Sequence, residues 1–392
     1  MNMETLSEAL GCMDLKYVDE ALNYSCTRTK KRRIALKLLA GAACLVLAVY
    51  AGARAFAPQA VPEPTPDANL PVLELDTAWL TDGQGAFVLR MRDFSEYSFG
   101  SPWSADTGLA ALPVFANPVE YAPVEQNRAA LSWDEAAMRE RLLGLAASLG
   151  MDAGEDDIVC SLDTDGALWS LSLSGGDVSI EVLRDLSARV EFETPLELPV
   201  EFSLSSPRES YEAAGEYFAE HYAALFGIEN PRWAVAGGDY NYDGKTQNYS
   251  LRVYAAGENT AESLVNYCFG GVALIPGEDG ELRSLRLGSA PESLGNYPLV
   301  SLEEATELVL NGHELPDTLS TLRAEDIAGV TLVYHVGMYD EYYAPYYRFA
   351  FVEREPFYTE TLPEGFTGYT FYYIPAISPE YTSLANWDGS VN

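Results

Sequence analysis

The sequence predicts an α+β fold, in which an N-terminal transmembrane helix precedes an ectodomain of about three helix-plus-antiparallel-meander units. Three observations predict it: an apolar run beside a basic cluster, three capping motifs that each open a helical apolar pattern, and strand-like runs after each helix. The predicted parts are a cytoplasmic segment (1–33), the transmembrane helix (34–57), a Pro-rich stalk (58–70), an extended lead-in (71–125) and three α+β units (126–200, 201–295 and 296–392).

The transmembrane helix is predicted from length and charge. No residue from Leu38 to Ala53 is charged, and the run 34–57 exceeds the roughly 20 apolar residues that cross a bilayer. Because the basic cluster 28–33 precedes it, the positive-inside rule predicts a single-pass protein of the cell membrane, with a cytoplasmic N-terminus and the C-terminal part outside. A cleaved signal peptide is the alternative, but the segment before the run is longer than a signal peptide carries.

Each unit is predicted to open with a helix that begins at a Ser-x-x-Glu capping box. In such a box the serine and the glutamate satisfy free amide groups at the helix start, and a glycine after the last turn suits the left-handed cap. The boxes and their glycines are Ser132–Glu135 with Gly150, Ser206–Glu209 with Gly227, and Ser301–Glu304 with Gly312.

Alternating side chains predict the antiparallel strands, because successive residues of a strand point to opposite faces. The pattern is clearest near the C-terminus, where it places two aromatic sets on two faces: Tyr347, Phe349 and Phe351 on one, and Tyr369, Phe371 and Tyr373 on the other.

The charge distribution limits the partners of the chain. The formal net charge is −35, and residues 1–57 hold eight of the 24 Lys and Arg but only five of the 59 Asp and Glu, which leaves about −38 for the rest. Such a surface repels nucleic acids and anionic lipid headgroups, whereas cations and basic peptides are attracted. We therefore expect no nucleic-acid partner.

Residues 297–377 resemble a known kind of module. The run YPLVSLEEATELVLNG, followed by GVTLVYHV, YYAPYYRFAFVE and YTFYYIPAI, is similar to the PepSY and YycI-type modules of membrane-anchored regulators in low-GC Gram-positive bacteria. The resemblance implies an extracytoplasmic accessory or inhibitory protein without catalysis, and it supplies no catalytic residue.

One stretch, DYNYDGKTQNYS, begins like a calcium-binding EF-hand loop. Asp239, Asn241 and Asp243 occupy the first ligand positions, but Ser250 stands where the loop needs a bidentate glutamate. Because strand-like runs flank an Asp-Gly pair, the preferred interpretation is a hairpin turn. A weak calcium site at these three residues is the alternative, and no other cofactor is predicted.

Two further sets of residues are candidates for structural or binding roles. Cys160 and Cys268 form a disulfide if the predicted exterior is oxidising, or two buried free thiols. The tyrosines of the segment 339–346 form either a partner-binding surface or part of the sheet core; they are Tyr339, Tyr342, Tyr343 and Tyr346.

No catalytic residue is predicted. The three histidines, His221, His313 and His335, lie in different segments without metal-ligand spacing, and no nucleophile elbow or phosphate loop occurs. We therefore expect a non-catalytic extracytoplasmic sensor or regulatory protein that is anchored in the membrane and acts on a membrane signalling partner. The alternatives are an envelope hydrolase that uses paired carboxylates and a surface module that binds a basic peptide or a cation.

Overall fold

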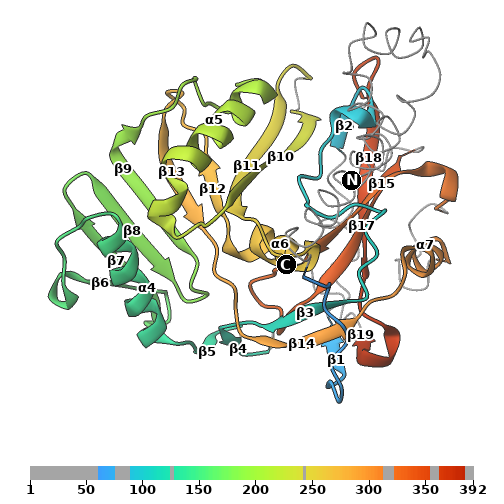
Figure 1. Ribbon diagram of the computed structural model, residues 1–392, viewed down its shortest axis with the longest axis horizontal. Coiled ribbons are helices and arrows are strands. Elements are labelled where there is room, and N and C mark those ends of the chain that lie inside the picture. Colours follow the sequence, from blue (N-terminus) through green and yellow to red (C-terminus); the bar gives the residue numbers. More distant parts are fainter. Residues whose placement is uncertain are drawn as a thin grey trace, which may run out of the picture. The chain divides into compact units, whose positions relative to one another are not determined.

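A long antiparallel sheet organises the chain. The computed structural model describes residues 61–75, 89–123, 128–241, 244–311, 322–353 and 362–384. Within them, twelve strands pair in the order β15-β17-β18-β2-β10-β11-β12-β13-β9-β8-β7-β6 (Figure 1). Their bounds are β2 (Leu89–Met91), β6 (Val159–Leu162), β7 (Leu168–Gly175), β8 (Val178–Leu183), β9 (Ala188–Leu196), β10 (Pro231–Tyr240), β11 (Gln247–Ala255), β12 (Val272–Ile275), β13 (Leu282–Leu287), β15 (Ile327–Tyr334), β17 (Pro345–Val352) and β18 (Thr367–Pro375).

Helices and smaller sheets surround this sheet. The α-helices within the described residues are α4 (Glu135–Ser148), α5 (Arg208–His221), α6 (Thr260–Val265) and α7 (Leu302–Asn311). A three-stranded sheet has the order β14-β3-β16, and two pairs of strands, β1-β19 and β4-β5, stand apart. Their bounds are β1 (Leu73–Leu75), β3 (Ala111–Ala116), β4 (Glu120–Tyr121), β5 (Ala130–Ser132), β14 (Ser293–Pro298), β16 (Tyr342–Tyr343) and β19 (Thr382–Leu384).

The predicted α+β fold of about three helix-plus-antiparallel-meander units is wrong, because the described chain is mostly β and has one large, continuous sheet. Strands of different predicted units pair with each other. In β9 and β13, Val190 lies opposite Leu285. The short strand β2 pairs both with β10 and with β18. A meander that ended at each unit boundary would leave edges with unpaired amides, and the continued pairing removes those edges.

We call two parts of the sheet the aliphatic half and the aromatic half. The aliphatic half runs from β10 to β6 in the sheet order (β10, β11, β12, β13, β9, β8, β7 and β6), and the aromatic half consists of β15, β17 and β18. In the aliphatic half, α4 and α5 cover one face (Figure 1). Leu171, Ile180 and Val190 point into that core, while their neighbours Glu181 and Arg189 lie on the opposite face. This alternation is typical of an antiparallel sheet with one solvated face.

The packing of α5 on the aliphatic half depends on a glycine. Tyr211, Ala214 and Phe218 of this helix are fully buried. A Cβ atom at Gly215 would lie 2.8 Å from the Leu251 side chain on β11, which is closer than real contacts allow. The missing side chain therefore lets the helix approach the sheet.

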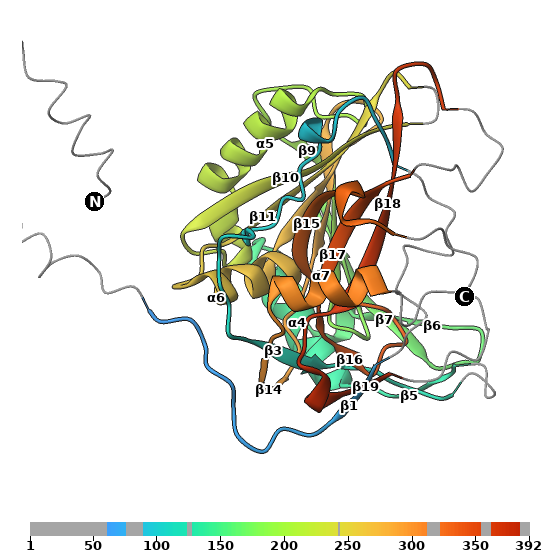
Figure 2. The ribbon, with the colours of Figure 1, turned by 90° about the vertical axis from the view of Figure 1, so that its right-hand side faces the viewer.

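In the aromatic half, both faces are covered. On one face, α7 lies against β18 (Figure 2). Phe349 and Phe351 belong to the same buried core as Ala305 and Val309 of this helix. Phe371, whose neighbour across the strand pair is Ala350, meets Tyr97 and Phe99 on the other, at ring-centroid distances of 5.7 and 6.1 Å. The two aromatic sets thus lie on two faces, as the alternation predicts.

The predicted membrane localisation is corrected by the structure. Among the described residues, no helix combines the length and apolar character needed to cross a membrane. This finding contradicts the prediction of a single-pass protein of the cell membrane with its C-terminal part outside. The predicted cytoplasmic segment (1–33) and bilayer-crossing segment (34–57) lie outside the described residues.

The three predicted capping boxes have different outcomes. At α7 the box is confirmed: Ser301 N donates to Glu304 Oε2 (2.8 Å) and Glu304 N donates to Ser301 Oγ (3.2 Å). At α4 the prediction is wrong, because Asp134 is the N-cap and accepts from Ala137 N (2.9 Å). At α5 the helix follows Pro207 and no side chain caps it. The described glycines, Gly150 and Gly227, adopt the predicted left-handed conformation, and Gly312 lies outside the described residues.

The described part of the Pro-rich segment packs against the folded chain. Glu63 accepts hydrogen bonds from Thr260 N (2.8 Å) and Ala261 N (3.0 Å) at the start of α6. Asp67 accepts from Asn296 N (2.7 Å) in β14. The predicted boundaries of the stalk, the lead-in and the three units stay predictions.

A candidate ligand-binding pocket

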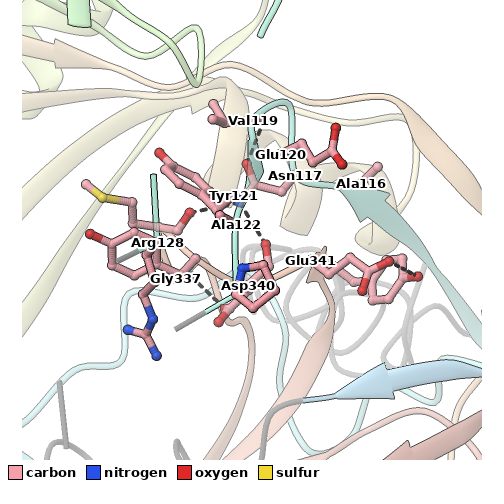
Figure 3. Close-up of a pocket in the computed structure, with 14 residues that line it drawn as sticks. Ala116, Asn117, Val119, Glu120, Tyr121, Ala122, Arg128, Gly337, Asp340 and Glu341 are labelled. Carbon is pink, nitrogen blue, oxygen red and sulfur yellow. Dashed lines mark hydrogen bonds between the residues drawn. The ribbon is translucent and has the colours of Figure 1, made fainter. Parts of the chain in front are cut away.

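A cavity of about 950 Å³ opens where the loop after β3 meets the loop between β15 and β16 (Figure 3). Pairing of β3 with β16, with Phe115 opposite Tyr343, brings these loops together although more than 200 residues separate them. The lining residues are Ala116, Asn117, Val119, Glu120, Tyr121, Ala122, Pro123, Arg128, Gly337, Met338, Tyr339, Asp340, Glu341 and Tyr342. This volume suits a small molecule or a few residues of a peptide.

Asn117 joins the two loops. Its Nδ2 donates to the carbonyl oxygens of Met338 (2.9 Å) and Asp340 (2.7 Å), and its Oδ1 accepts from Val119 N (2.9 Å). Dashed lines in Figure 3 follow these bonds from Asn117. One side-chain amide therefore bonds with both loops and ties the two sides of the pocket wall together.

Asp340 closes the second loop. Its Oδ2 accepts from Gly337 N (2.8 Å) and lies 2.6 Å from His335 Nδ1. A Cβ atom at residue 337 would lie 2.6 Å from the Asp340 carboxylate, so any larger residue here would displace that carboxylate from its bonds. The Asp340 carboxylate therefore stabilises its own loop by hydrogen bonds and is not directed at a ligand in the pocket.

Aromatic rings form one side of the pocket. The rings of Tyr121 and Tyr339 meet edge to face, with centroids 4.9 Å apart, and the Arg128 guanidinium lies 4.7 Å from the Tyr339 ring centroid. Tyr339 remains 45% exposed. Burial raises the pKa of Tyr121, so its hydroxyl stays protonated and able to donate at neutral pH.

The remaining carboxylates of the pocket accept local hydrogen bonds. Glu120 Oε2 accepts from Ser132 Oγ (2.9 Å) in the β4-β5 pair. Glu341 Oε1 accepts from the Tyr342 hydroxyl (2.5 Å), and this bond, together with burial, raises the pKa of Tyr342 to about 12. The arrangement offers stacking surface and hydrogen-bonding groups, which suits recognition.

A smaller cavity of about 190 Å³ shares Asn117, Tyr121 and Met338 with the pocket and reaches the turn between β8 and β9. Arg184 lies at this turn and is almost fully buried. Its guanidinium bonds with Asp163 Oδ2 (2.5 Å) and the Leu168 carbonyl oxygen, and lies 4.8 Å from the Trp133 ring. The aliphatic half thus contributes a rigid wall beside the pocket.

The structure separates the four tyrosines proposed as a partner surface. Tyr339 and Tyr342 line the pocket. Tyr343 and Tyr346 are buried, with 4% and 5% of their surface exposed, so these two fit the alternative of a sheet core. Tyr343 lies in β16 and Tyr346 in β17, and the side chains of both are packed in the core. Tyr339 lies in the loop before β16.

The EF-hand-like stretch forms the preferred hairpin. β10 and β11 pair across it, with Tyr240 opposite Gln247. Asn241 turns the chain: its carbonyl oxygen accepts from Gly244 N (3.0 Å). Asp239 accepts from Asn248 Nδ2 (2.8 Å), and burial raises the pKa of its carboxyl group.

The weak calcium site stays a prediction. Asp243 lies outside the described residues. In the described part of the chain, no group of three or more His, Cys, Asp or Glu side chains is arranged to hold a metal ion.

The predicted disulfide is not formed. Cys160 in β6 and Cys268 after α6 are free thiols. Cys160 is exposed at one edge of the sheet, whereas Cys268 packs with the core of the aromatic half, where burial raises the pKa of its thiol to about 11. The alternative of two buried free thiols fits Cys268, which is packed against a core, but not the exposed Cys160.

Asn117, Arg128 and Asp340 are pocket residues that the sequence did not single out. The Gly-x-x-Asp pattern at 337–340 is a local turn signal. The long-range bonds of Asn117 leave no such signal, because its partners lie more than 200 residues away.

No protein-family model matches the chain, and comparison with curated proteins gives no significant match. Among solved structures, an uncharacterized protein from Eubacterium rectale is similar with a TM-score of 0.32 and 12% sequence identity. The match covers 69% of this chain and 84% of that chain. A TM-score of this size carries no argument about fold or function.

Proposed function

We propose that this chain is a non-catalytic regulatory protein that recognises a partner protein through the pocket between Tyr121 and Tyr339. The observation that carries the proposal is the half-exposed Tyr339 ring at a pocket whose loops are already fixed by Asn117 and Asp340. Exposed tyrosines on a rigid support lose little conformational entropy when they are covered, which is why they are enriched in interfaces. The resemblance of residues 297–377 to PepSY and YycI-type modules supports a regulatory role.

The chemistry of the pocket favours recognition over hydrolysis by paired carboxylates. A hydrolase of that kind needs one carboxyl group held protonated as a general acid. Glu120, Asp340 and Glu341 instead accept hydrogen bonds from Ser132, Gly337 and Tyr342, so each carboxylate is held in a local bond and does not face another carboxylate as a pair. These carboxylates therefore organise the rim.

Site-specific photo-crosslinking of the full-length chain in its native cells tests the proposal. A photoreactive amino acid replaces Tyr339, and the same replacement of Leu204, which is 64% exposed and lies outside the pocket lining, is the matched control. We expect a protein captured from position 339 and not from position 204.

A second variant ties capture to the pocket. Asn117→Ala removes the bonds between the loops while leaving Tyr339 in place, and we expect it to lower capture at position 339 by about tenfold, which corresponds to about 1.4 kcal/mol. Equal capture with and without Asn117, or the same proteins from positions 339 and 204, would contradict the proposal.

A further inference from the structure

We infer that the free edge of β6 is a second binding site, which takes up an extended basic peptide segment as an added strand. β6 is the last strand of the sheet, and among the described residues it pairs with β7 alone. All four of its residues are exposed, including Val159 at 60% and Leu162 at 63%. An edge of this kind presents a row of backbone donors and acceptors that another strand can pair with.

The strand at the opposite edge of the sheet, β15, is covered by other residues, whereas β6 is exposed. No residue of β15 at that edge is exposed, and Thr331, Leu332 and Tyr334 are buried. Ser101 Oγ donates to the Leu332 carbonyl oxygen (3.3 Å), and the Phe94 ring packs against Gly329. Residues 94–103 therefore cover β15, whereas no described segment covers β6 in this way.

The charges beside β6 identify the occupant as basic. Glu155, Asp156 and Asp157 precede the strand and are exposed, and Asp165 lies exposed after it. Asp163 is committed to Arg184, and Arg139 of α4, whose charge reaches Glu155 and Cys160, is paired with Glu135 (2.6 Å). A strand added at this edge would have acidic groups beside both of its ends. Lysine or arginine at both ends of the incoming segment would satisfy them.

The same charges exclude a second copy of this chain. Antiparallel pairing of two β6 strands would place the acidic residues 155–157 of one copy opposite Asp163 and Asp165 of the other. Like charges that face each other across strands are destabilising, and the net charge of −35 adds repulsion between the copies. Apolar side chains at the edge with acidic flanks thus fit a segment that has β-branched residues in the middle and basic residues at the ends.

Hydrogen exchange of the full-length chain with a synthetic probe tests this inference. The probe is the octapeptide Arg-Lys-Thr-Val-Thr-Val-Lys-Arg at low ionic strength, and the control is the same peptide with N-methylated central residues, which cannot pair as a strand. We expect the probe to slow exchange of amides in 159–162 and to leave 327–334 unchanged. Equal binding of the N-methylated peptide, or protection elsewhere only, would overturn the inference.

Charge variants separate local from overall attraction. Asp156→Lys with Asp165→Lys reverses two exposed charges beside β6, and Glu216→Lys with Glu220→Lys makes the same change in net charge on α5. We expect the first pair to weaken probe binding by about tenfold and the second by less than about twofold. Equal loss in both would show nonspecific attraction and overturn the site.

Two further outcomes are decisive. A homodimer that crosslinks through Cys160 would assign the edge to a second copy and overturn the basic-peptide inference. Asn117→Ala should leave probe binding unchanged, because the pocket and the β6 edge are separate sites. A loss of partner capture at position 339 in that variant with normal probe binding would keep the two proposals distinguishable.

Discussion

The two halves of the large sheet bury their strands in different ways. In the aliphatic half, Leu, Ile and Val face the core under α4 and α5, and charged residues such as Glu181 and Arg189 occupy the other face. In the aromatic half, rings fill both faces, and residues 94–103 supply the second cover. The difference shows that the side-chain pattern of a strand indicates whether one or both faces of the sheet are covered. It also indicates whether aliphatic or aromatic side chains fill the covered faces.

The largest expected effect comes from removing a ring on the second face of the aromatic half. Phe371→Ala should lower the free energy of unfolding by about 3–5 kcal/mol, because a buried ring is replaced by a cavity. Arg189→Ala on the solvated face of the aliphatic half is the matched control and should change it by less than about 0.5 kcal/mol. Urea denaturation of both variants measures this. Similar losses of unfolding free energy in Phe371→Ala and Arg189→Ala would contradict the conclusion that this face is covered in the aromatic half and solvated in the aliphatic half.

An effect of intermediate size is expected from the buried cation of the aliphatic half. Arg184→Met removes the partner of Asp163, whose pKa is lowered mainly by the Arg184 hydrogen bond. Because that pKa is lower in the folded than in the unfolded chain, the pair stabilises above the unfolded carboxyl pKa of about 3.9 and its contribution disappears as the pH falls through the folded value. The Tm gap between wild type and variant should thus be largest near pH 7 and shrink below about pH 4.

Arg208→Met is the matched control for this pH dependence. Its pair with Glu212 is substantially exposed on both sides, so we expect a small Tm change at every pH. A gap for Arg184→Met that stays constant down to about pH 3 would show that packing between Trp133 and Trp169, and not the charge of Asp163, accounts for the loss.

Local signals in the sequence predicted local structure. The Asp-Gly pair predicted the β10-β11 hairpin, the alternation near the C-terminus predicted two aromatic faces, and Ser301 with Glu304 predicted a capping box. The continuous sheet was not predictable in this way. Its joins, such as β9 with β13 and β2 with β18, connect strands about 90 to nearly 280 residues apart, and any antiparallel pairing would satisfy the same alternation.

The pocket shows the same limit. Tyr339 and Tyr342 were candidates because aromatic residues cluster around a loop, but the pattern could not separate them from the buried Tyr343 and Tyr346. That separation depends on β16, which pairs with β3 and turns Tyr343 inward. Asn117 acquires its role only when this pairing forms.

The smallest expected effects concern how helices begin in the two halves. Ser301→Ala at α7 and Asp134→Ala at α4 each remove a side chain that caps a helix, so each should lower the free energy of unfolding by about 1 kcal/mol. Ser132→Ala tests the capping box that the structure rejects, and it should cost less than about 0.5 kcal/mol, because this serine bonds only with the exposed Glu120. Urea denaturation of the three variants measures the order. A loss for Ser132→Ala as large as that for Asp134→Ala would mean that α4 begins where the sequence motif places it, two residues before the observed cap.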